Sequence, residues 1–274
     1  MHAETQSFVG RSARIASRSG TTYFHSEMSV LPPPPTPAVT DLALFLDVDG
    51  TLLDIAPTPE SVIVSEQLKH LLTTLSSRLD GAFALVSGRS IRTLDALFEP
   101  LRFTAAGIHG CERREASGCI IRPEVDVARV AAVRDELTAW TLRHPGTLLE
   151  DKGYALALHY RLVPELEVPA LSEVETALAM LGTHELQRGK FVFELRPAGY
   201  SKGGAIQAFM RDPPFRSRQP LFIGDDVTDE AGFEAVNELA GISVRVGEST
   251  QTFARHRLGT VQEVIRWLAN LATS

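Results

Sequence analysis

The chain has 274 residues, of which 44% are hydrophobic and 22% charged, the proportions of an ordinary globular protein. Its 27 basic and 34 acidic residues give a net charge of −7 with no Lys/Arg-rich block, which argues against nucleic acid or an anionic membrane as the main partner. No apolar stretch reaches the roughly 20 residues of a spanning helix. Cys111 and Cys119 have no metal-type spacing, and we expect two free thiols in a reducing cytoplasm.

The amino-terminal segment differs in composition from the rest of the chain. Residues 1–36 lack apolar periodicity and end in the proline run 32–35, which predicts a disordered tail closed by a stiff, Pro-rich linker. The segment has no apolar stretch of the kind that a secretory signal needs. An organelle transit peptide is the alternative, but Glu4 and Glu27 argue against it. We expect translation to start at Met28.

From residue 41 the pattern alternates apolar strands with amphipathic helices, which is typical of a doubly wound, Rossmann-like α/β fold. Strands are predicted at 42–46, 83–86 and 103–108. Ser65 is the predicted N-cap of a helix whose apolar positions are Leu68, Leu71, Leu72, Leu75 and Leu79. A second helix presents Ile91, Leu94, Leu97 and Phe98 on one face.

After Gly110 the predicted pattern changes from alternating strands and helices to paired strands separated by single helices. The predicted elements are a hairpin at 111–122, helices at 125–143 and 172–181, and strands at 147–150, 154–160, 185–188 and 191–195. We therefore expect an inserted α+β cap domain at 111–195. The alternation of strands and helices resumes with a helix at 202–210 and strands at 220–223 and 242–246. A last helix begins with a capping box formed by Thr260 and Glu263. The catalytic core is thus predicted at 37–110 and 196–274.

Four segments place groups suited to phosphate where core elements end or begin. They are Asp47 and Asp49, then Ser87-Gly88-Arg89, then Lys202, and finally Asp225 and Asp226 followed by Asp229 and Glu230. Each has an ordinary structural explanation by itself, such as a helix cap or a solvated side chain. Their joint occurrence at the edge where α/β enzymes bind ligands favours phosphoryl chemistry.

The chemistry requires positive charge next to the first two aspartates. A carboxylate that attacks a phosphate dianion meets repulsion of about 4 kcal/mol per unit pair at about 4 Å and an effective dielectric of 20. Asp47 and Asp225 offer the hard oxygen ligands that Mg²⁺ prefers, and Lys202 offsets the remaining charge. In this interpretation Asp47 becomes an aspartyl-phosphate, while Asp49 protonates the leaving sugar oxygen and then deprotonates the attacking water.

The order of these motifs resembles the haloacid dehalogenase-like (HAD) phosphatase superfamily, and the inserted layer resembles its C2-type cap. Four further segments resemble the trehalose-6-phosphate phosphatases: Gly107-Ile108-His109-Gly110, Glu150-Asp151-Lys152-Gly153, His159-Tyr160-Arg161 and Gly224-Asp225-Asp226-Val227-Thr228-Asp229-Glu230. The resemblance covers the chain from about Leu42 to its carboxyl end. It implies Mg²⁺-dependent hydrolysis of trehalose 6-phosphate to trehalose and phosphate, the last step of trehalose biosynthesis.

The resemblance also implies roles for particular residues. Asp47 is the nucleophile and Asp49 the acid/base, and the metal is held by Asp47, Asp225 and the backbone of Asp49. The remaining assignments are Asp226 and Asp229 as support of the metal site, Ser87, Gly88 and Lys202 as phosphate ligands, and Arg89, Glu150, Lys152 and Glu194 as substrate ligands. We expect His109 and His159 to be hydrogen-bonded structural histidines.

Other functions remain open at this point. A phosphatase with the same cap could act on sucrose phosphate or a mannosyl phosphoglycerate, and a mutase would keep the phosphate on the sugar. A non-catalytic sugar-phosphate sensor is disfavoured because Asp47, Asp49, Lys202 and Asp225 are all present. A receiver-type signalling domain, which also uses Mg²⁺ and an aspartyl-phosphate, is disfavoured because such a domain needs no inserted cap. The synthase that makes trehalose 6-phosphate is expected on a separate chain.

Overall fold

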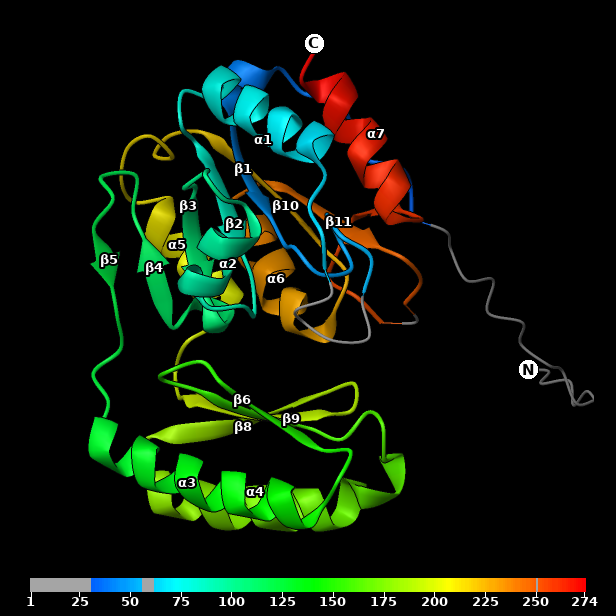
Figure 1. Cartoon of the computed structure of the whole chain (residues 1–274). Helices are drawn as coiled ribbons and strands as arrows, with labels where there is room; N and C mark the ends of the chain where they lie inside the picture. The colour runs from blue at the N-terminus through cyan, green and yellow to red at the C-terminus, as the bar shows by residue number, and fades with distance from the viewer. Residues whose placement is uncertain (1–30, 56–61, 250) are drawn as a thin grey trace, which may run out of the picture.

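The structure is a computed structural model that describes residues 31–55, 62–249 and 251–274. The expectation that Met28 is the start lies outside these residues, as does most of the predicted tail. The described chain forms two units, one built on an eight-stranded sheet and the other on a four-stranded sheet (Figure 1). The predicted fold class, an α/β core with an inserted α+β layer, is confirmed.

The first sheet contains all the strands of the predicted core. In order across the sheet they are β12 (His256–Leu258), β11 (Ile242–Val246), β10 (Gln219–Gly224), β1 (Leu42–Leu46), β2 (Phe83–Val86), β3 (Thr104–Gly107), β4 (Glu112–Arg114) and β5 (Ile120–Ile121). The strands from β12 to β3 are parallel. Because β1 pairs with β10 on one side and β2 on the other, the carboxyl end of β1 is a topological switch point, where such folds bind ligands.

The predicted start of the cap at residue 111 is wrong. β4 pairs antiparallel with β3, and β5 pairs with β4, so the hairpin extends the first sheet (Figure 1). The buried carboxylate of Glu112 also accepts a hydrogen bond from the backbone N–H of Ile91 and ties β4 to α2. The sequence indicated the hairpin, but pairing with a strand elsewhere in the fold decides to which unit it belongs. The second unit begins with α3.

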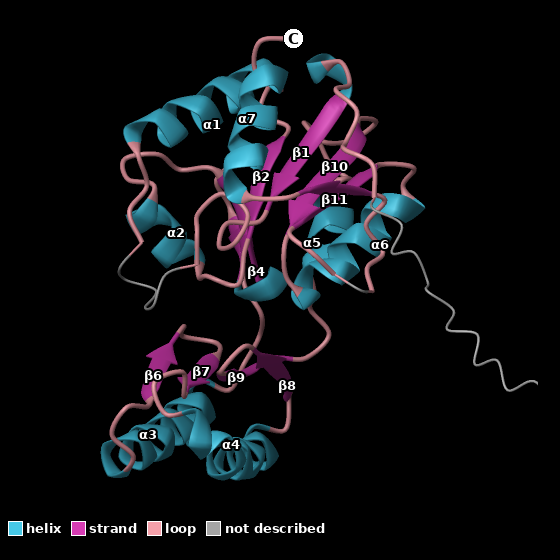
Figure 2. Ribbon diagram, turned by 90° about the vertical axis from the view of Figure 1, so that its right-hand side faces the viewer, coloured by secondary structure: helices cyan, strands magenta, loops and turns pink. Residues whose placement is uncertain are grey.

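Helices cover both faces of the first sheet, with α1 and α7 on one face and α5 and α6 on the other (Figure 2). The core helices are α1 (Glu66–Arg78), α2 (Ile91–Leu97), α5 (Lys202–Phe209), α6 (Glu230–Glu238) and α7 (Val261–Leu271). Ser65 caps α1 by accepting from Leu68 N, as predicted. Thr260 accepts from Glu263 N, but the Glu263 carboxylate accepts from Gly259 N, so the predicted box is offset by one residue.

The second unit is a four-stranded antiparallel sheet with two helices on one face. Its elements are β6 (Leu148–Asp151), β7 (Leu156–His159), β9 (Val192–Pro197), β8 (His184–Gly189), α3 (Val127–Arg143) and α4 (Glu167–Leu181). Side chains alternate across β7 and β9, so Leu156, Leu158 and Phe193 pack in a hydrophobic cluster with the helices. The other face of the sheet is turned toward the first unit (Figure 1).

Part of the predicted tail is ordered. Pro34 is buried, Leu31 packs against the core, and the Pro32 carbonyl accepts a hydrogen bond of 3.0 Å from Arg257 N. A proline cannot donate from its backbone but still accepts, so a run without periodicity can lie along an edge strand. Cys111 and Cys119 are free thiols, as expected. Within the described ranges, no helix combines the length and apolar character needed to cross a membrane.

Candidate active site

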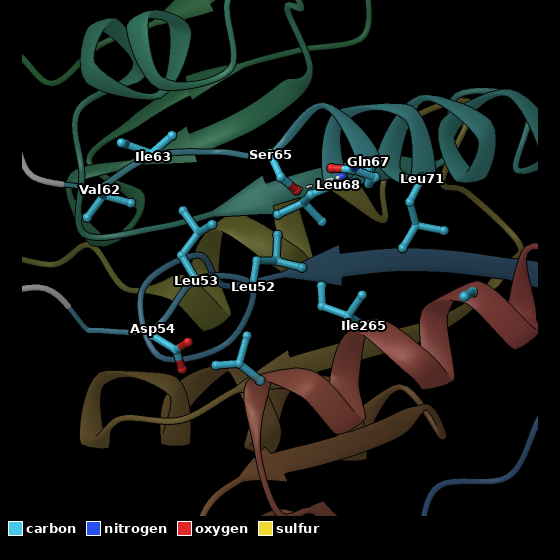
Figure 3. A pocket seen from close by; sticks show the side chains of 12 residues that line it. Leu52, Leu53, Asp54, Val62, Ile63, Ser65, Gln67, Leu68, Leu71 and Ile265 are labelled. Atoms are coloured by element: carbon cyan, nitrogen blue, oxygen red, sulfur yellow. Dashed lines mark hydrogen bonds between the residues drawn. The ribbon is translucent and has the colours of Figure 1, made fainter.

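The predicted site residues, apart from Asp229, line one cavity of about 560 Å³ between the two units. Asp47 follows β1 and Asp225 follows β10, and the N–H of Asp47 donates to the carbonyl of Ile223 in β10 (3.0 Å). Because these strands are parallel neighbours, their carboxyl ends bring the two aspartates together. A hollow of similar volume lies between α1 and α7, but its lining is mostly apolar (Figure 3). The chemistry therefore points to the first cavity.

Lys202 binds two buried carboxylates. Its Nζ lies 2.8 Å from Asp47 Oδ1 and 2.6 Å from Asp229 Oδ1. Asp47, Lys202 and Asp229 are each at most 4% exposed. Burial raises the pKa of Asp47, and the charges of Asp229 and Asp225 raise it further, against the opposing charge of Lys202. Burial would lower the pKa of Lys202, but the two carboxylates hold it above its ordinary value, so the ammonium stays charged.

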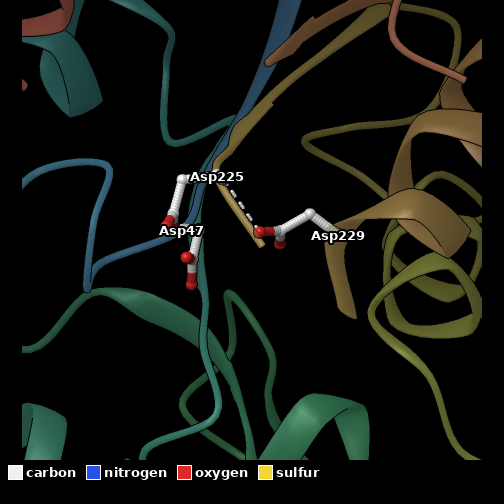
Figure 4. Close-up of side chains that lie close together, drawn as sticks. All are labelled: Asp47, Asp225 and Asp229. Atoms are coloured by element: carbon white, nitrogen blue, oxygen red, sulfur yellow. Dashed lines mark hydrogen bonds between the residues drawn. The ribbon is translucent and has the colours of Figure 1, made fainter. Parts of the chain in front are cut away.

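Asp47, Asp225 and Asp229 are the described acidic residues whose side-chain oxygens lie close enough to share a cation, within 4.8 Å of one another (Figure 4). Both oxygens of Asp229 are already engaged, Oδ1 with Lys202 and Oδ2 with the N–H groups of Asp225 and Asp226. Asp47 and Asp225 are therefore the two of the three that could hold a cation, and Asp229 holds Asp225 and Lys202 in position. Burial and the charge of Asp229 raise the pKa of Asp225 to about 6, which a bound cation would reverse.

The donor set fits a hard divalent cation. It consists of carboxylate oxygens, and the one lysine near it cannot neutralise three carboxylates. The expectation that the Asp49 backbone joins this set stays a prediction, and the side chain of Asp49 is not in the cluster. Asp226 is exposed and accepts from Val227 N, so its support of the site is confined to the start of the short helix Val227–Asp229.

Arg89 and Asp49, which both line the cavity, form an ion pair of 2.7 Å. The arginine side chain is only 9% exposed and the aspartate 36% exposed. The sequence placed Arg89 among the substrate ligands, whereas here it contacts the carboxylate predicted to move protons. Ser87 is buried, and its Oγ accepts from Arg89 N at 3.2 Å. Since Ser90 caps α2, Ser87 is left to line the cavity rather than the helix.

The second unit supplies Glu150, Lys152 and Glu194 to the same cavity. Lys152 Nζ lies 3.1 Å from Glu194 Oε2 and donates to the carbonyl of Gly88 in the core at 3.0 Å. Burial opposes the charge of Glu194, but Lys152 and His109 outweigh it and bring the pKa to about 2. Glu150 pairs with His159 (3.0 Å), which gives that histidine a hydrogen-bonded role, as expected.

Sequence reasoning missed several residues of the cavity. Arg161, Arg188 and Lys190 of the second unit also line it. Arg161 belongs to the segment His159-Tyr160-Arg161, whose resemblance to the family was a usable signal. Arg188 and Lys190 had none, because an exposed basic residue in a hairpin has no distinctive pattern.

Comparisons with known proteins agree with this geometry. The family model described as trehalose-phosphatase matches residues 45–260. A probable trehalose-phosphate phosphatase of Sinorhizobium fredii is 47% identical over 212 residues, covering 76% of this chain and 80% of that protein. A trehalose-6-phosphate phosphatase of Escherichia coli is 44% identical over 234 residues, covering 85% of this chain and 87% of that one.

Solved structures give the same result. The crystal structure of a trehalose-6-phosphate phosphatase related protein superposes with a TM-score of 0.73 at 29% identity, covering 85% of this chain and 97% of that one. A HAD phosphatase of Bacteroides thetaiotaomicron, at 19% identity and a TM-score of 0.56, shares the fold. Fold, site and relatives together define a phosphatase, a phosphoric monoester hydrolase. More particularly, the chain belongs to the trehalose-phosphatase family.

Proposed function

We propose that this protein hydrolyses trehalose 6-phosphate to trehalose and phosphate with the help of Mg²⁺. The observation that carries the proposal is the buried contact of 2.8 Å between Asp47 and Lys202, next to Asp225, in a cavity that the second unit closes. The core side of the cavity offers groups for phosphate, and the cap side offers carboxylates and a lysine for sugar hydroxyls. A disaccharide monophosphate matches both sides.

The first chemical step belongs to Asp47. A carboxylate oxygen of Asp47 bonds to phosphorus while the bond from phosphorus to the sugar oxygen breaks, which gives an aspartyl-phosphate. Asp49 donates a proton to the departing oxygen, and Arg89 orients Asp49 for this task. Both oxygens of Asp49 bond to Arg89, so one contact has to open before Asp49 reaches the leaving group.

The second step regenerates the enzyme. Asp49 takes a proton from a water molecule that attacks phosphorus, and the bond to Asp47 breaks with release of phosphate. Lys202 keeps its charge in both steps because two carboxylates raise its pKa. Asp47 and Asp225 would hold Mg²⁺, which would supply the charge neutralisation that one lysine cannot. Closure of the second unit excludes bulk water from the intermediate.

An assay of phosphate release tests the proposal. We expect turnover of trehalose 6-phosphate with Mg²⁺, none after chelation, and none in Asp47→Asn, whose circular dichroism should match the wild type. Movement of the phosphate to another hydroxyl of the sugar, without release of inorganic phosphate, would indicate a mutase instead. Turnover of sucrose 6-phosphate well above that of trehalose 6-phosphate would refute the substrate assignment.

The cellular setting is part of the same proposal. The charged and hydrogen-bonding groups of the cavity suit a small sugar phosphate, and we assign no role to nucleic acid or membrane binding. A cytoplasmic enzyme with two free thiols would complete trehalose biosynthesis after a synthase on a separate chain. Fractionation of cells and measurement of trehalose 6-phosphate in a deletion strain would test this: the metabolite should accumulate.

A further inference from the structure

The turn Gly107–Gly110 contacts the segment Ser87-Gly88-Arg89, here called the phosphate loop, as well as the start of α5 and the second unit. Its backbone is bonded to the phosphate loop, because Ile108 N donates to Arg89 O at 2.9 Å and His109 N donates to Ser87 O at 3.0 Å. Gly110 lies so close to the start of α5 that a Cβ there would come within 2.4 Å of the Ser201 carbonyl oxygen. The turn is therefore fixed against both phosphate-binding elements of the core.

The turn also has an unusual backbone. Ile108 (φ 48°), His109 (φ 55°) and Gly110 (φ 102°) are three consecutive residues in the left-handed region. A β-branched residue such as isoleucine is rare in that region, and such conformations persist where the surrounding structure requires them. The consequence here is the direction of the His109 side chain, which points across the phosphate loop toward the cap.

The His109 ring bridges the two units. It covers Gly88 so closely that a Cβ on that glycine would lie 2.7 Å from Cε1 and Nε2 of the ring. The same nitrogen, Nε2, lies 3.4 Å from Glu194 Oε2 in the second unit. The same carboxylate oxygen contacts Lys152 Nζ, and Lys152 returns to the Gly88 carbonyl. Gly88, Lys152, Glu194 and His109 thus close a ring of contacts between phosphate loop and cap.

Two atoms of this ring have unused hydrogen-bonding capacity. His109 Nδ1 and Glu194 Oε1 are buried and have no hydrogen-bond partner among the described residues. Buried polar atoms normally have partners, and both residues line the cavity. Burial lowers the pKa of His109, so the ring is neutral at pH 7 and carries a single N–H. A neutral ring can donate to Glu194 and still leave one nitrogen for a hydroxyl of the substrate.

We propose that His109 is a positioning residue that holds Glu194 against the phosphate loop and thereby makes the enzyme prefer sugar phosphates to small phosphate esters. The inference rests on the proposed function, because it needs a substrate whose sugar reaches the cap. A small ester such as p-nitrophenyl phosphate engages mainly the core groups. Loss of the contact between His109 and Glu194 should therefore harm the sugar substrate more than the small one.

Two substitutions separate the two ring nitrogens. His109→Gln places an amide near the position of Nε2 and can still reach Glu194, whereas His109→Asn places it near Nδ1 and cannot. Asparagine also tolerates the left-handed backbone, so a loss in His109→Asn is not explained by the turn. Thermal unfolding of both variants serves as the folding control.

We expect kcat/KM for trehalose 6-phosphate, divided by kcat/KM for p-nitrophenyl phosphate, to fall about tenfold in His109→Asn, mainly through KM for the sugar phosphate. His109→Gln should recover most of that ratio. An equal loss for both substrates in His109→Asn, or a loss in His109→Gln as large as in His109→Asn, would overturn the inference. A wild-type enzyme that does not prefer trehalose 6-phosphate at all would instead refute the proposed function.

Discussion

Arg89 holds the carboxylate of Asp49 with two hydrogen bonds of equal length, from Nε to Oδ2 and from Nη2 to Oδ1, both 2.7 Å. A planar guanidinium can make this paired contact, and a lysine ammonium cannot. The pair fixes the side chain that is proposed to move protons. Positioning of Asp49 thus depends on a residue of the phosphate loop.

We predict that Arg89→Lys lowers kcat on the order of 10²-fold, because lysine keeps the charge but releases the orientation of Asp49. The matched control is Arg92→Lys, which changes an exposed arginine three residues further along the chain and should leave kcat within twofold. Steady-state kinetics with trehalose 6-phosphate measure both. Wild-type kcat in Arg89→Lys would show that charge alone, and not the paired geometry, matters at this position.

Lys202 is predicted to be as important for stability as for activity. Lys202→Met leaves the buried carboxylates of Asp47 and Asp229 without their partner, and breaking such a pair costs about 3–5 kcal/mol. We expect urea denaturation in the presence of a chelator to show a loss of this size in the free energy of unfolding at pH 7.5. The loss should shrink toward pH 5, where unpaired carboxylates gain protons. A variant as stable as the wild type at both values would contradict the buried network.

The raised pKa of Asp225 predicts how stability depends on pH and Mg²⁺. A carboxyl whose folded pKa, about 6, lies above its ordinary value of 3.8 contributes stability at low pH that is lost as pH rises through about 6. A cation binds the ionised form and restores that loss. Adding Mg²⁺ should therefore raise the Tm more at pH 7.5 than at pH 5.

Asp225→Asn provides the control for that experiment. The variant should lose most of the Mg²⁺-dependent rise in Tm at pH 7.5, because the amide cannot supply a charged ligand. An equal rise in the wild type at both pH values, or an undiminished rise in Asp225→Asn, would show that the cation binds elsewhere.

The sequence was sufficient to predict the core because its signals are local. Asp47 and Asp225 each follow a short apolar run, and parallel strands necessarily bring such residues to one edge. Lys202 opens a helix behind Ser201, which caps it by accepting from Gly204 N. The helices and strands of the second unit were also predictable, since each is a separate run bounded by turn residues.

Relationships across the fold were not predictable from the sequence. β4 has the pattern of a hairpin strand, and its pairing with β3 follows from packing alone. Arg89 and Asp49 are far apart in sequence, and a Ser-Gly-Arg motif does not say whether its arginine binds a substrate or a carboxylate. His109 lies in a segment that resembles the family, but the sequence did not indicate where its side chain points. A left-handed backbone at a non-glycine residue has no sequence signature.

Gly50 should tolerate no side chain, and the reason is its distance from Asp225. Its φ of +79° already disfavours other residues, and a Cβ there would lie 2.1 Å from Asp225 Oδ2. We predict that Gly50→Ala displaces the Asp225 carboxylate, weakens the Mg²⁺-dependent rise in Tm and lowers kcat on the order of 10²-fold. Gly118→Ala is the matched control, since Gly118 has a φ of +86° with no atom within 4 Å of the added Cβ.

Gly118→Ala should lose roughly 1–2 kcal/mol of stability, the cost of a left-handed backbone at alanine, and should keep its activity. Comparison of the two alanine variants therefore separates backbone strain from the displacement of Asp225. Suppose that Gly50→Ala and Gly118→Ala lost stability equally and both kept full activity with Mg²⁺. The close approach of Gly50 to the Asp225 carboxylate would then have no part in assembling the site. Kinetics and thermal unfolding with and without Mg²⁺ on the same preparations decide between these outcomes.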